Sequence, residues 1–153
     1  MTKLKKDFKV KNRKSTGALI LSKKTGRFLF GLRSELETYP LTWGIFGGKL
    51  LSKESNLEGL ERELREEIKE IPNIIQIIPV DLYINKEKFF EYFSFLIIVE
   101  DEFIPKLNKE HVGYCWVELD KWKTIKLHPS VKKTLNNNLL IKSFKKIIKD
   151  FKK

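Results

Sequence analysis

A chain of 153 residues, 41% hydrophobic and 33% charged, predicts one soluble globular domain spanning residues 1–153. Its longest apolar runs are too short to cross a bilayer, and the basic N-terminus precedes no apolar stretch, which excludes a transmembrane helix and a secretory signal. The formal net charge of +11 is concentrated in a basic N-terminal segment (1–14) and a basic C-terminal segment (121–153), whereas residues 15–120 are mildly acidic. The single cysteine, Cys115, excludes an internal disulfide and indicates a reducing compartment, the cytoplasm.

The first third of the chain predicts a β-hairpin followed by a loop. Residues 15–22 and 27–34 are strand-like and are separated by the turn sequence KKTG. Residues 37–48 contain a proline and three glycines, so we expect a loop there, with a short strand at 43–46.

Three further strands and a helical end follow. Residues 74–84 and 88–99 predict a second strand pair, and residues 113–119 predict another strand after a loop over 101–111. A basic helical segment is expected over about 130–151, with Ser130 as its N-cap. The order of elements predicts a mixed β-sheet with helices packed on it, an α/β fold.

One strong helix is expected inside the chain, from about Asn56 to Lys69. Ser52, Ser55 or Asn56 can cap its start, and Pro72 stops it. At about 100° per residue, an apolar stripe faces the sheet. The residues of that stripe are Leu57, Leu60, Leu64 and Ile68. Gly59 leaves room for another backbone to approach the helix closely.

Four carboxylates share the other face of this helix: Glu63, Glu66, Glu67 and Glu70. Like charges at this spacing repel one another, so an acidic face is either a solvated surface with ordinary ion pairs or a site for a hard cation. Mg²⁺ takes a few protein carboxylates and leaves positions for water and phosphate oxygens. A Gly-rich loop directly before the helix favours the second interpretation.

The residues around this helix resemble the Nudix box, a pattern of Gly, five residues, Glu, seven residues, and Arg-Glu-apolar-any-Glu-Glu. Gly48, Glu54 and the run Arg62-Glu63-Leu64-Arg65-Glu66-Glu67 match every anchor at the right spacing. The family's next glycine is Lys69 here, and the final apolar position holds Glu70. Either Lys69 adopts the left-handed conformation that ends the helix, or the helix continues toward Pro72.

The resemblance implies an α/β/α sandwich and a role for each matching residue. Glu63, Glu66 and Glu67 resemble the metal carboxylates, and the carbonyl of Gly47 or Gly48 is a further candidate ligand. Glu54 and Arg62 resemble the supporting pair that ties the loop to the helix and orients Glu63. Lys49 is either a contact to substrate phosphate or an ordinary surface lysine. Glu110 is the favoured additional ligand or general base, in competition with Asp101 and Glu102.

The resemblance also implies an activity: Mg²⁺-dependent hydrolysis, with Mn²⁺ as a substitute, of a nucleoside diphosphate linked to another moiety. A nucleoside triphosphate is the favoured substrate. A dinucleoside polyphosphate, ADP-ribose or an RNA 5′ cap is the alternative, and the basic termini favour RNA slightly. A non-catalytic nucleotide- or RNA-binding module and a basic nucleic-acid-binding protein are the other classes considered. His111 is a weaker candidate for a base, since a lone loop histidine is more often structural or exposed, and a homodimer is compatible with the sequence.

Overall fold

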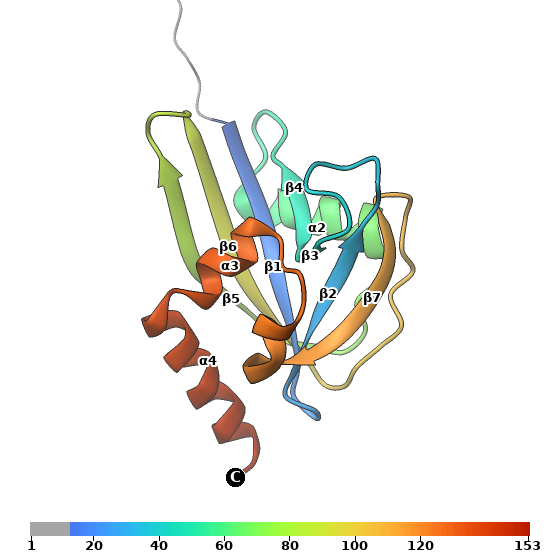
Figure 1. The fold of residues 1–153 in the computed structure, drawn as a ribbon, viewed down its shortest axis with the longest axis vertical. Coiled ribbons are helices and arrows are strands. Elements are labelled where there is room, and N and C mark those ends of the chain that lie inside the picture. Colours follow the sequence, from blue (N-terminus) through green and yellow to red (C-terminus); the bar gives the residue numbers. More distant parts are fainter. Residues whose placement is uncertain (1–12) are drawn as a thin grey trace, which may run out of the picture.

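A seven-stranded mixed β-sheet forms the centre of the described part of the chain, residues 13–153 of a computed structural model (Figure 1). Its strands are β1 (Arg13–Ser22), β2 (Arg27–Arg33), β3 (Trp43–Gly44), β4 (Phe46–Lys49), β5 (Ile74–Asn85), β6 (Phe90–Val99) and β7 (His111–Glu118). β1 with β2, and β5 with β6, form the two predicted antiparallel pairs. β1 and β6 run parallel, so the predicted mixed sheet is confirmed.

β1 has two different partners on the side away from β6. β4 pairs with β1 along residues 15–18, and β2 pairs with it only at residues 20–21. The sheet therefore divides at the middle of β1, and β7 extends the β2 branch. Gly47 and Gly48, expected in a loop, belong to strand β4. This strand leads the chain to the internal helix.

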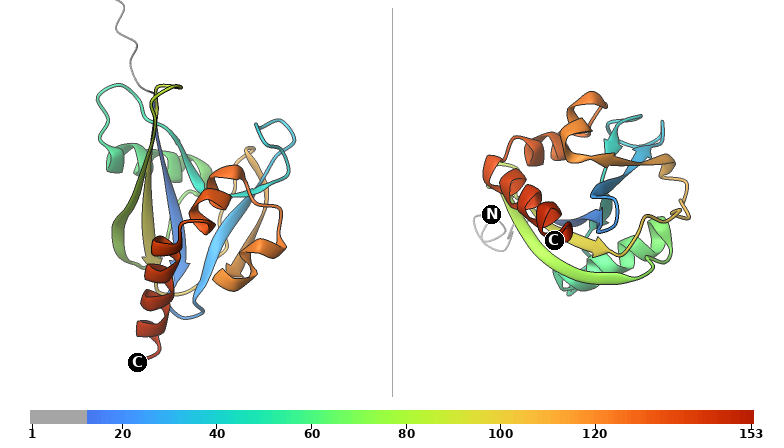
Figure 2. Two further views of the ribbon diagram at one scale, coloured as in Figure 1. Left: turned by 60° about the vertical axis from the view of Figure 1, so that its left-hand side comes forward. Right: turned by 90° about the horizontal axis from the view of Figure 1, so that it is seen from below.

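Helices cover both faces of the sheet (Figure 2). α2 (Asn56–Ile68) packs on one face, and α3 (Pro129–Leu135), α4 (Asn138–Phe151) and the 3₁₀ segment η1 (Leu119–Thr124) pack on the other. The predicted α/β/α sandwich is therefore confirmed. No helix within residues 13–153 is long and apolar enough to cross a membrane.

Alternate residues of β1 enter two separate hydrophobic cores. Leu19 and Leu21 point toward α3 and α4, whereas Ala18 and Ile20 point toward α2. This alternation follows from the two-residue period of a strand. The core on the α2 side includes Leu29, Phe46, Leu60, Leu64, Ile68 and Ile97. Each such side chain stabilises the fold by about 1.5–3 kcal/mol on full burial, which fixes α2 against β1 and β4.

Two expectations about α2 were wrong. Leu57, expected in the apolar stripe, is 41% exposed, and it belongs to neither of the two hydrophobic cores. Gly59 does not admit another backbone; a side chain there would collide with that of Leu50. Among the candidate caps, Ser55 is the N-cap, and its Oγ accepts a hydrogen bond from the backbone of Glu58 at 3.1 Å.

The predicted C-terminal helical segment consists of two helices, α3 and α4. His128, rather than Ser130, caps α3, and its Nδ1 accepts a hydrogen bond from the Ser130 backbone at 3.1 Å. The cap lies there because Pro129 occupies the first helical position, where its missing N–H costs nothing. Of the predicted basic segment 1–14, residues 1–12 lie outside the described part of the chain.

Candidate active site

α2 ends at Ile68, one residue after the last acidic anchor of the motif. Lys69 follows with φ 65° and ψ −104°, so a lysine adopts the positive φ that a glycine takes easily. Glu70 consequently lies beyond the helix and does not share the acidic face with Glu63, Glu66 and Glu67.

Glu67 is the buried acid of this helix, with 1% of its surface exposed. Its Oε1 accepts a hydrogen bond from the Gly47 backbone at 3.0 Å, which joins α2 to β4. Its Oε2 lies 3.6 Å from Nδ1 of His111. The Glu67 carbonyl oxygen also accepts a hydrogen bond from the Asn108 backbone at 3.1 Å, so the loop before β7 is held against the helix.

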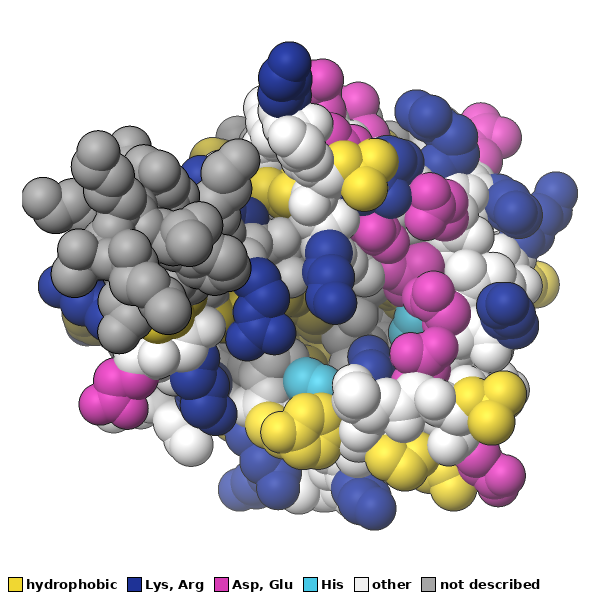
Figure 3. Space-filling view, turned by 90° about the horizontal axis from the view of Figure 1, so that it is seen from above, with side chains coloured by type: hydrophobic (Ala, Val, Ile, Leu, Met, Phe, Trp, Pro, Cys, Tyr) yellow, Lys and Arg dark blue, Asp and Glu magenta, His cyan; other side chains and the backbone are white. Residues whose placement is uncertain are grey.

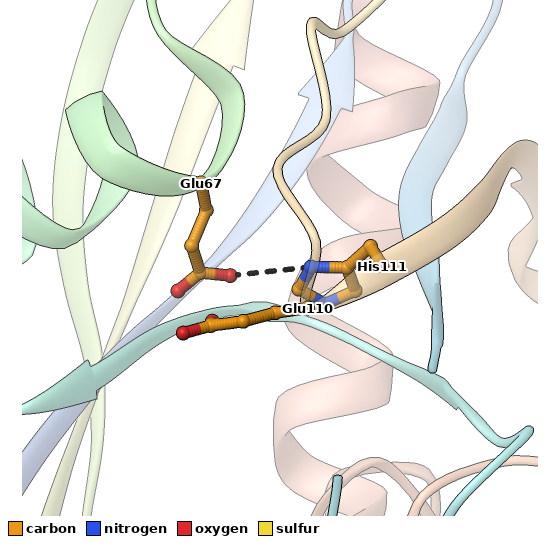
Figure 4. Close-up of side chains that lie close together, drawn as sticks. All are labelled: Glu67, Glu110 and His111. Atoms are coloured by element: carbon orange, nitrogen blue, oxygen red, sulfur yellow. Dashed lines mark ion pairs between the residues drawn. The ribbon is translucent and has the colours of Figure 1, made fainter. Parts of the chain in front are cut away.

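That loop delivers Glu110 and His111 to Glu67. The Asn108 side chain accepts a hydrogen bond from the Glu110 backbone at 2.9 Å, and the Glu110 carbonyl accepts one from Ser34 at 2.9 Å. One ligand atom from each of Glu67, Glu110 and His111 lies within 4.8 Å of the other two (Figure 4). The structure thus brings together the end of α2, at Ile68, and the start of β7, at His111, which are 43 residues apart in the sequence.

The other two candidates for this loop position are engaged elsewhere. Asp101 pairs with Lys24 at 3.3 Å. Glu102 accepts two hydrogen bonds from the guanidinium of Arg27. Glu110 is therefore the loop carboxylate that reaches the acidic face of α2.

Arg62 connects the loop before α2 to the acidic face. Its guanidinium donates to both carboxylate oxygens of Glu54, at 2.8 and 3.1 Å, and to the Lys49 carbonyl at 2.9 Å. It also donates to Glu63 at 3.1 Å and to Glu66 at 3.2 Å. A planar fork with five donors serves all these acceptors at once, a geometry that lysine does not provide.

Glu63 lies directly against Gly48. A Cβ at position 48 would lie 2.5 Å from the Glu63 carboxyl carbon, so glycine is needed for this close approach. At Gly47 an added Cβ would collide with the backbone of Thr16, and φ there is 151°. The two glycines therefore have different tasks: Gly48 makes room for a carboxylate, and Gly47 for the neighbouring strand.

Burial disfavours the charged form of the carboxylates in this site. It raises the pKa of Glu67 to about 9, against the opposing hydrogen bond from Gly47. Burial also raises the pKa of Glu63, against the opposing hydrogen bond from Arg62. For Glu110 the pKa is raised by burial and, to a smaller extent, by neighbouring acids. Several carboxylates held together under partial burial fit a hard divalent cation, which supplies the missing positive charge and takes oxygen ligands.

His111 is the buried residue that sequence reasoning undervalued. The residue is 6% exposed, and its ring packs on that of Phe46 with centroids 4.8 Å apart. Burial lowers its pKa to about 4, so the imidazole is neutral at pH 7. Its proximity to Glu67 depends on how the β7 loop folds, and no motif spacing in the sequence reports that.

A cavity of about 690 Å³ opens beside strand β4, and three residues of this strand, Gly47, Gly48 and Lys49, form part of its wall. Its basic lining residues are Arg13, Arg33, Lys49, Lys88 and Lys133, and its ring-bearing lining residues are Tyr39, Tyr83, Phe90, Tyr92 and His128. Figure 3 shows the corresponding hollow, with Asp and Glu side chains in a band along one side and Lys and Arg side chains opposite that band. The cavity therefore joins an acidic rim to a basic, aromatic interior.

Arg33 is a second cavity residue that the sequence did not single out. Its Nε donates to the Thr38 carbonyl at 2.7 Å and a terminal nitrogen donates to the Thr38 hydroxyl at 2.9 Å, which fixes the guanidinium. Its positive charge lowers the pKa values of Glu67 and His111, after the larger effects of burial. Arg33 thus lies between the acidic rim and the basic interior.

Comparison with known proteins identifies the arrangement. The NUDIX domain family model matches residues 11–137. The MutT protein from Methanosarcina mazei Go1 is 26% identical, with a TM-score of 0.59 over 96% of this chain and 100% of that chain. The NUDIX domain of Shewanella oneidensis NrtR complexed with ADP ribose is 15% identical, with a TM-score of 0.68 over 86% and 88%. The E. coli dihydroneopterin triphosphate pyrophosphohydrolase is 18% identical, with a TM-score of 0.63 over 89% and 99%. No curated protein matches the sequence.

Proposed function

The chain belongs to the Nudix hydrolase family, and from this premise we propose that it hydrolyses a pyrophosphate bond in a nucleoside diphosphate linked to a further group. The proposal is carried by one observation. Glu67, buried at the end of α2, has a carboxylate oxygen within 4.8 Å of one from Glu110. Glu67 is also hydrogen-bonded to Gly47 of β4, the strand that lines the basic cavity.

We assign the divalent ion, Mg²⁺ or Mn²⁺, to the acidic rim. Glu67, Glu63 and Glu110 are its inner carboxylates, and Glu66, whose side chain is 56% exposed, lies on the solvent side. The carbonyl of Gly47 or Gly48 is a further candidate ligand because both residues adjoin these carboxylates. When bound, the ion neutralises the diphosphate charge and polarises a phosphoryl oxygen.

The protein's own residues orient the substrate and take up the proton. Arg62 and Glu54 hold Glu63 in place through the hydrogen bonds described above. Glu110 is half-buried at the rim, and the carboxylate oxygen that does not bind the ion is the candidate base that accepts the proton of the attacking water. Lys49 lines the cavity and is exposed, a suitable position for contacting a substrate phosphate.

A nucleoside triphosphate is the substrate class we favour. The cavity combines cations with aromatic rings, which suits a ligand that carries both phosphates and a planar base. At about 690 Å³ it is the size of a typical pocket for one small ligand. The phosphates would lie toward Lys49 and the acidic rim, and the base toward the tyrosines.

A second candidate follows from the number of cations in the lining. Besides Arg33 and Lys49, the cavity is lined by Arg13, Lys88 and Lys133. A substrate with more phosphate groups, such as a dinucleoside polyphosphate with its longer phosphate chain or a capped RNA with its phosphodiester backbone, would use these cations as well.

Product identification on a substrate panel tests the proposal. Nucleoside triphosphates, ADP-ribose, dinucleoside polyphosphates and capped RNA are incubated with the full chain, with and without Mg²⁺ or Mn²⁺. We expect metal-dependent release of a nucleoside monophosphate from at least one of them. Binding of a nucleotide without turnover of any substrate would instead favour a non-catalytic nucleotide-binding module.

A further inference from the structure

His111 has two buried ring nitrogens that make no hydrogen bond within residues 13–153. Only 3% of its side chain is exposed. A buried polar group without a partner costs about 1–3 kcal/mol, so a fold retains one only where something else compensates. The neighbours of Nδ1 show what compensates for that nitrogen.

The ring is held in a fixed orientation. Phe46 packs against one side of it, and Gly31 makes room for it, because a Cβ at Gly31 would lie 2.6 Å from Cδ2 of His111. In this orientation Nδ1 points at the carboxylate of Glu67 (Figure 4).

The distance from Nδ1 to Oε2 of Glu67, 3.6 Å, is too long for a hydrogen bond. It is close to the spacing of two ligands that share one ion, since bonds of about 2.1 Å to each donor place the donors roughly 3–3.5 Å apart. Glu110 offers a third ligand atom within 4.8 Å of both.

We propose that Nδ1 of His111 is a nitrogen ligand of the divalent ion that Glu67 and Glu110 bind. This inference rests on the metal site assigned above, and it adds a ligand that the Nudix box does not contain. The imidazole converts an all-oxygen site into a mixed nitrogen and oxygen site.

A nitrogen ligand changes which divalent ions the site binds most tightly. Mg²⁺ is a hard cation that takes oxygen ligands, whereas transition metals accept imidazole nitrogen and bind such sites more tightly. His111 therefore favours an ion such as Mn²⁺, Fe²⁺ or Co²⁺ over Mg²⁺ at this position.

Electron spin echo spectroscopy of bound Mn²⁺ tests the assignment directly, because it detects ¹⁴N coupled to the ion. The full chain is prepared without a histidine tag and loaded with less than one equivalent of Mn²⁺. The sequence contains two histidines. His128→Asn is therefore the matched control, and His111→Ala and His111→Gln are the test variants.

We expect imidazole ¹⁴N modulation in wild type and in His128→Asn, and its loss in both His111 variants. In titration calorimetry, His111→Ala should bind Mn²⁺ about tenfold more weakly, with a smaller effect on Mg²⁺. Bound Mn²⁺ without ¹⁴N modulation in wild type would overturn the role of His111 but leave the carboxylate site intact. If wild type bound no Mn²⁺, the metal site itself would be wrong. Both wild-type results hold even if the His111 variants do not fold.

Discussion

The guanidinium of Arg62 donates two hydrogen bonds to the carboxylate of Glu54, at 2.8 and 3.1 Å, and thereby connects the loop before α2 to the helix. The same guanidinium reaches Glu63 and the Lys49 carbonyl. One residue therefore sets the position of Glu63, a proposed metal ligand, and of the strand that lines the cavity.

Replacing Arg62 with lysine should affect both activity and stability. Lysine keeps the charge but loses the two parallel hydrogen bonds to Glu54. We therefore expect the free energy of unfolding to fall by about 1–2 kcal/mol and kcat/KM to fall at least tenfold. Urea unfolding and steady-state kinetics measure the two effects. Arg65→Lys on the exposed part of the same helix is the control, and an equal loss in both variants would contradict this role.

The two glycines of β4 should respond differently to alanine. In Gly48→Ala the new methyl group displaces the flexible carboxylate of Glu63, so we expect a large loss of activity with little change in melting temperature. In Gly47→Ala it meets the Thr16 backbone, so the fold itself should be destabilised, by more than about 2 kcal/mol. Thermal melts and kinetics of both proteins separate the effects. Gly113→Ala, where the added Cβ makes ordinary contacts of 3.7 Å or more, is the control.

Lys69→Gly should stabilise the protein. Lys69 has φ 65°, which costs a residue with a Cβ on the order of 1 kcal/mol or more, whereas glycine adopts it without strain. The extra entropy of glycine in the unfolded chain offsets part of this gain, so we expect the free energy of unfolding, measured in urea, to rise by about 0.5–1 kcal/mol. Lys53→Gly, at φ 69°, is a second test of the same kind. Destabilisation in both would show that the backbone there is not strained.

His128 predicts a pH-dependent part of the stability. Burial, with help from Arg33, lowers its pKa to about 4 in the folded protein, compared with about 6.5 in the unfolded chain. The unfolded state therefore binds more protons in this range, and stability falls as the pH drops from about 6.5 toward 4. His128→Asn keeps a good helix cap but does not titrate there. Thermal melts between pH 4.5 and 7.5 should show a shallower decline for this variant than for wild type, and parallel curves would exclude the contribution of His128.

The hairpins, the α2 helix and its acid spacing were predictable from local patterns. The two-residue period of a strand explains which residues of β1 face each layer once the strand is in place, and the motif placed Glu63 and Glu67 on one face of α2. Strand β4 was not recognised, because its two glycines indicate a loop and its pairing with residues 15–18 is a long-range contact.

The rest of the site depends on tertiary placement. The sequence did not indicate that His111 would be buried against Glu67, since the approach is created by the Asn108 contacts and the start of β7. Arg33 and the ring-bearing side chains of the cavity come from separate strands and loops, so no local spacing groups them.

In the proposed function, turnover depends on a divalent ion that Glu67 holds. Glu67→Gln keeps the size of the side chain and an oxygen that can accept the Gly47 hydrogen bond, but removes the negative charge. Titration calorimetry with Mn²⁺, paired with kcat on the substrate found in the panel, compares this variant with Glu61→Gln on the exposed side of α2. We expect Glu67→Gln to bind the ion at least about tenfold more weakly and to lose roughly a hundredfold or more in kcat, while Glu61→Gln behaves as wild type. Unchanged ion affinity and turnover in Glu67→Gln would contradict this role of Glu67.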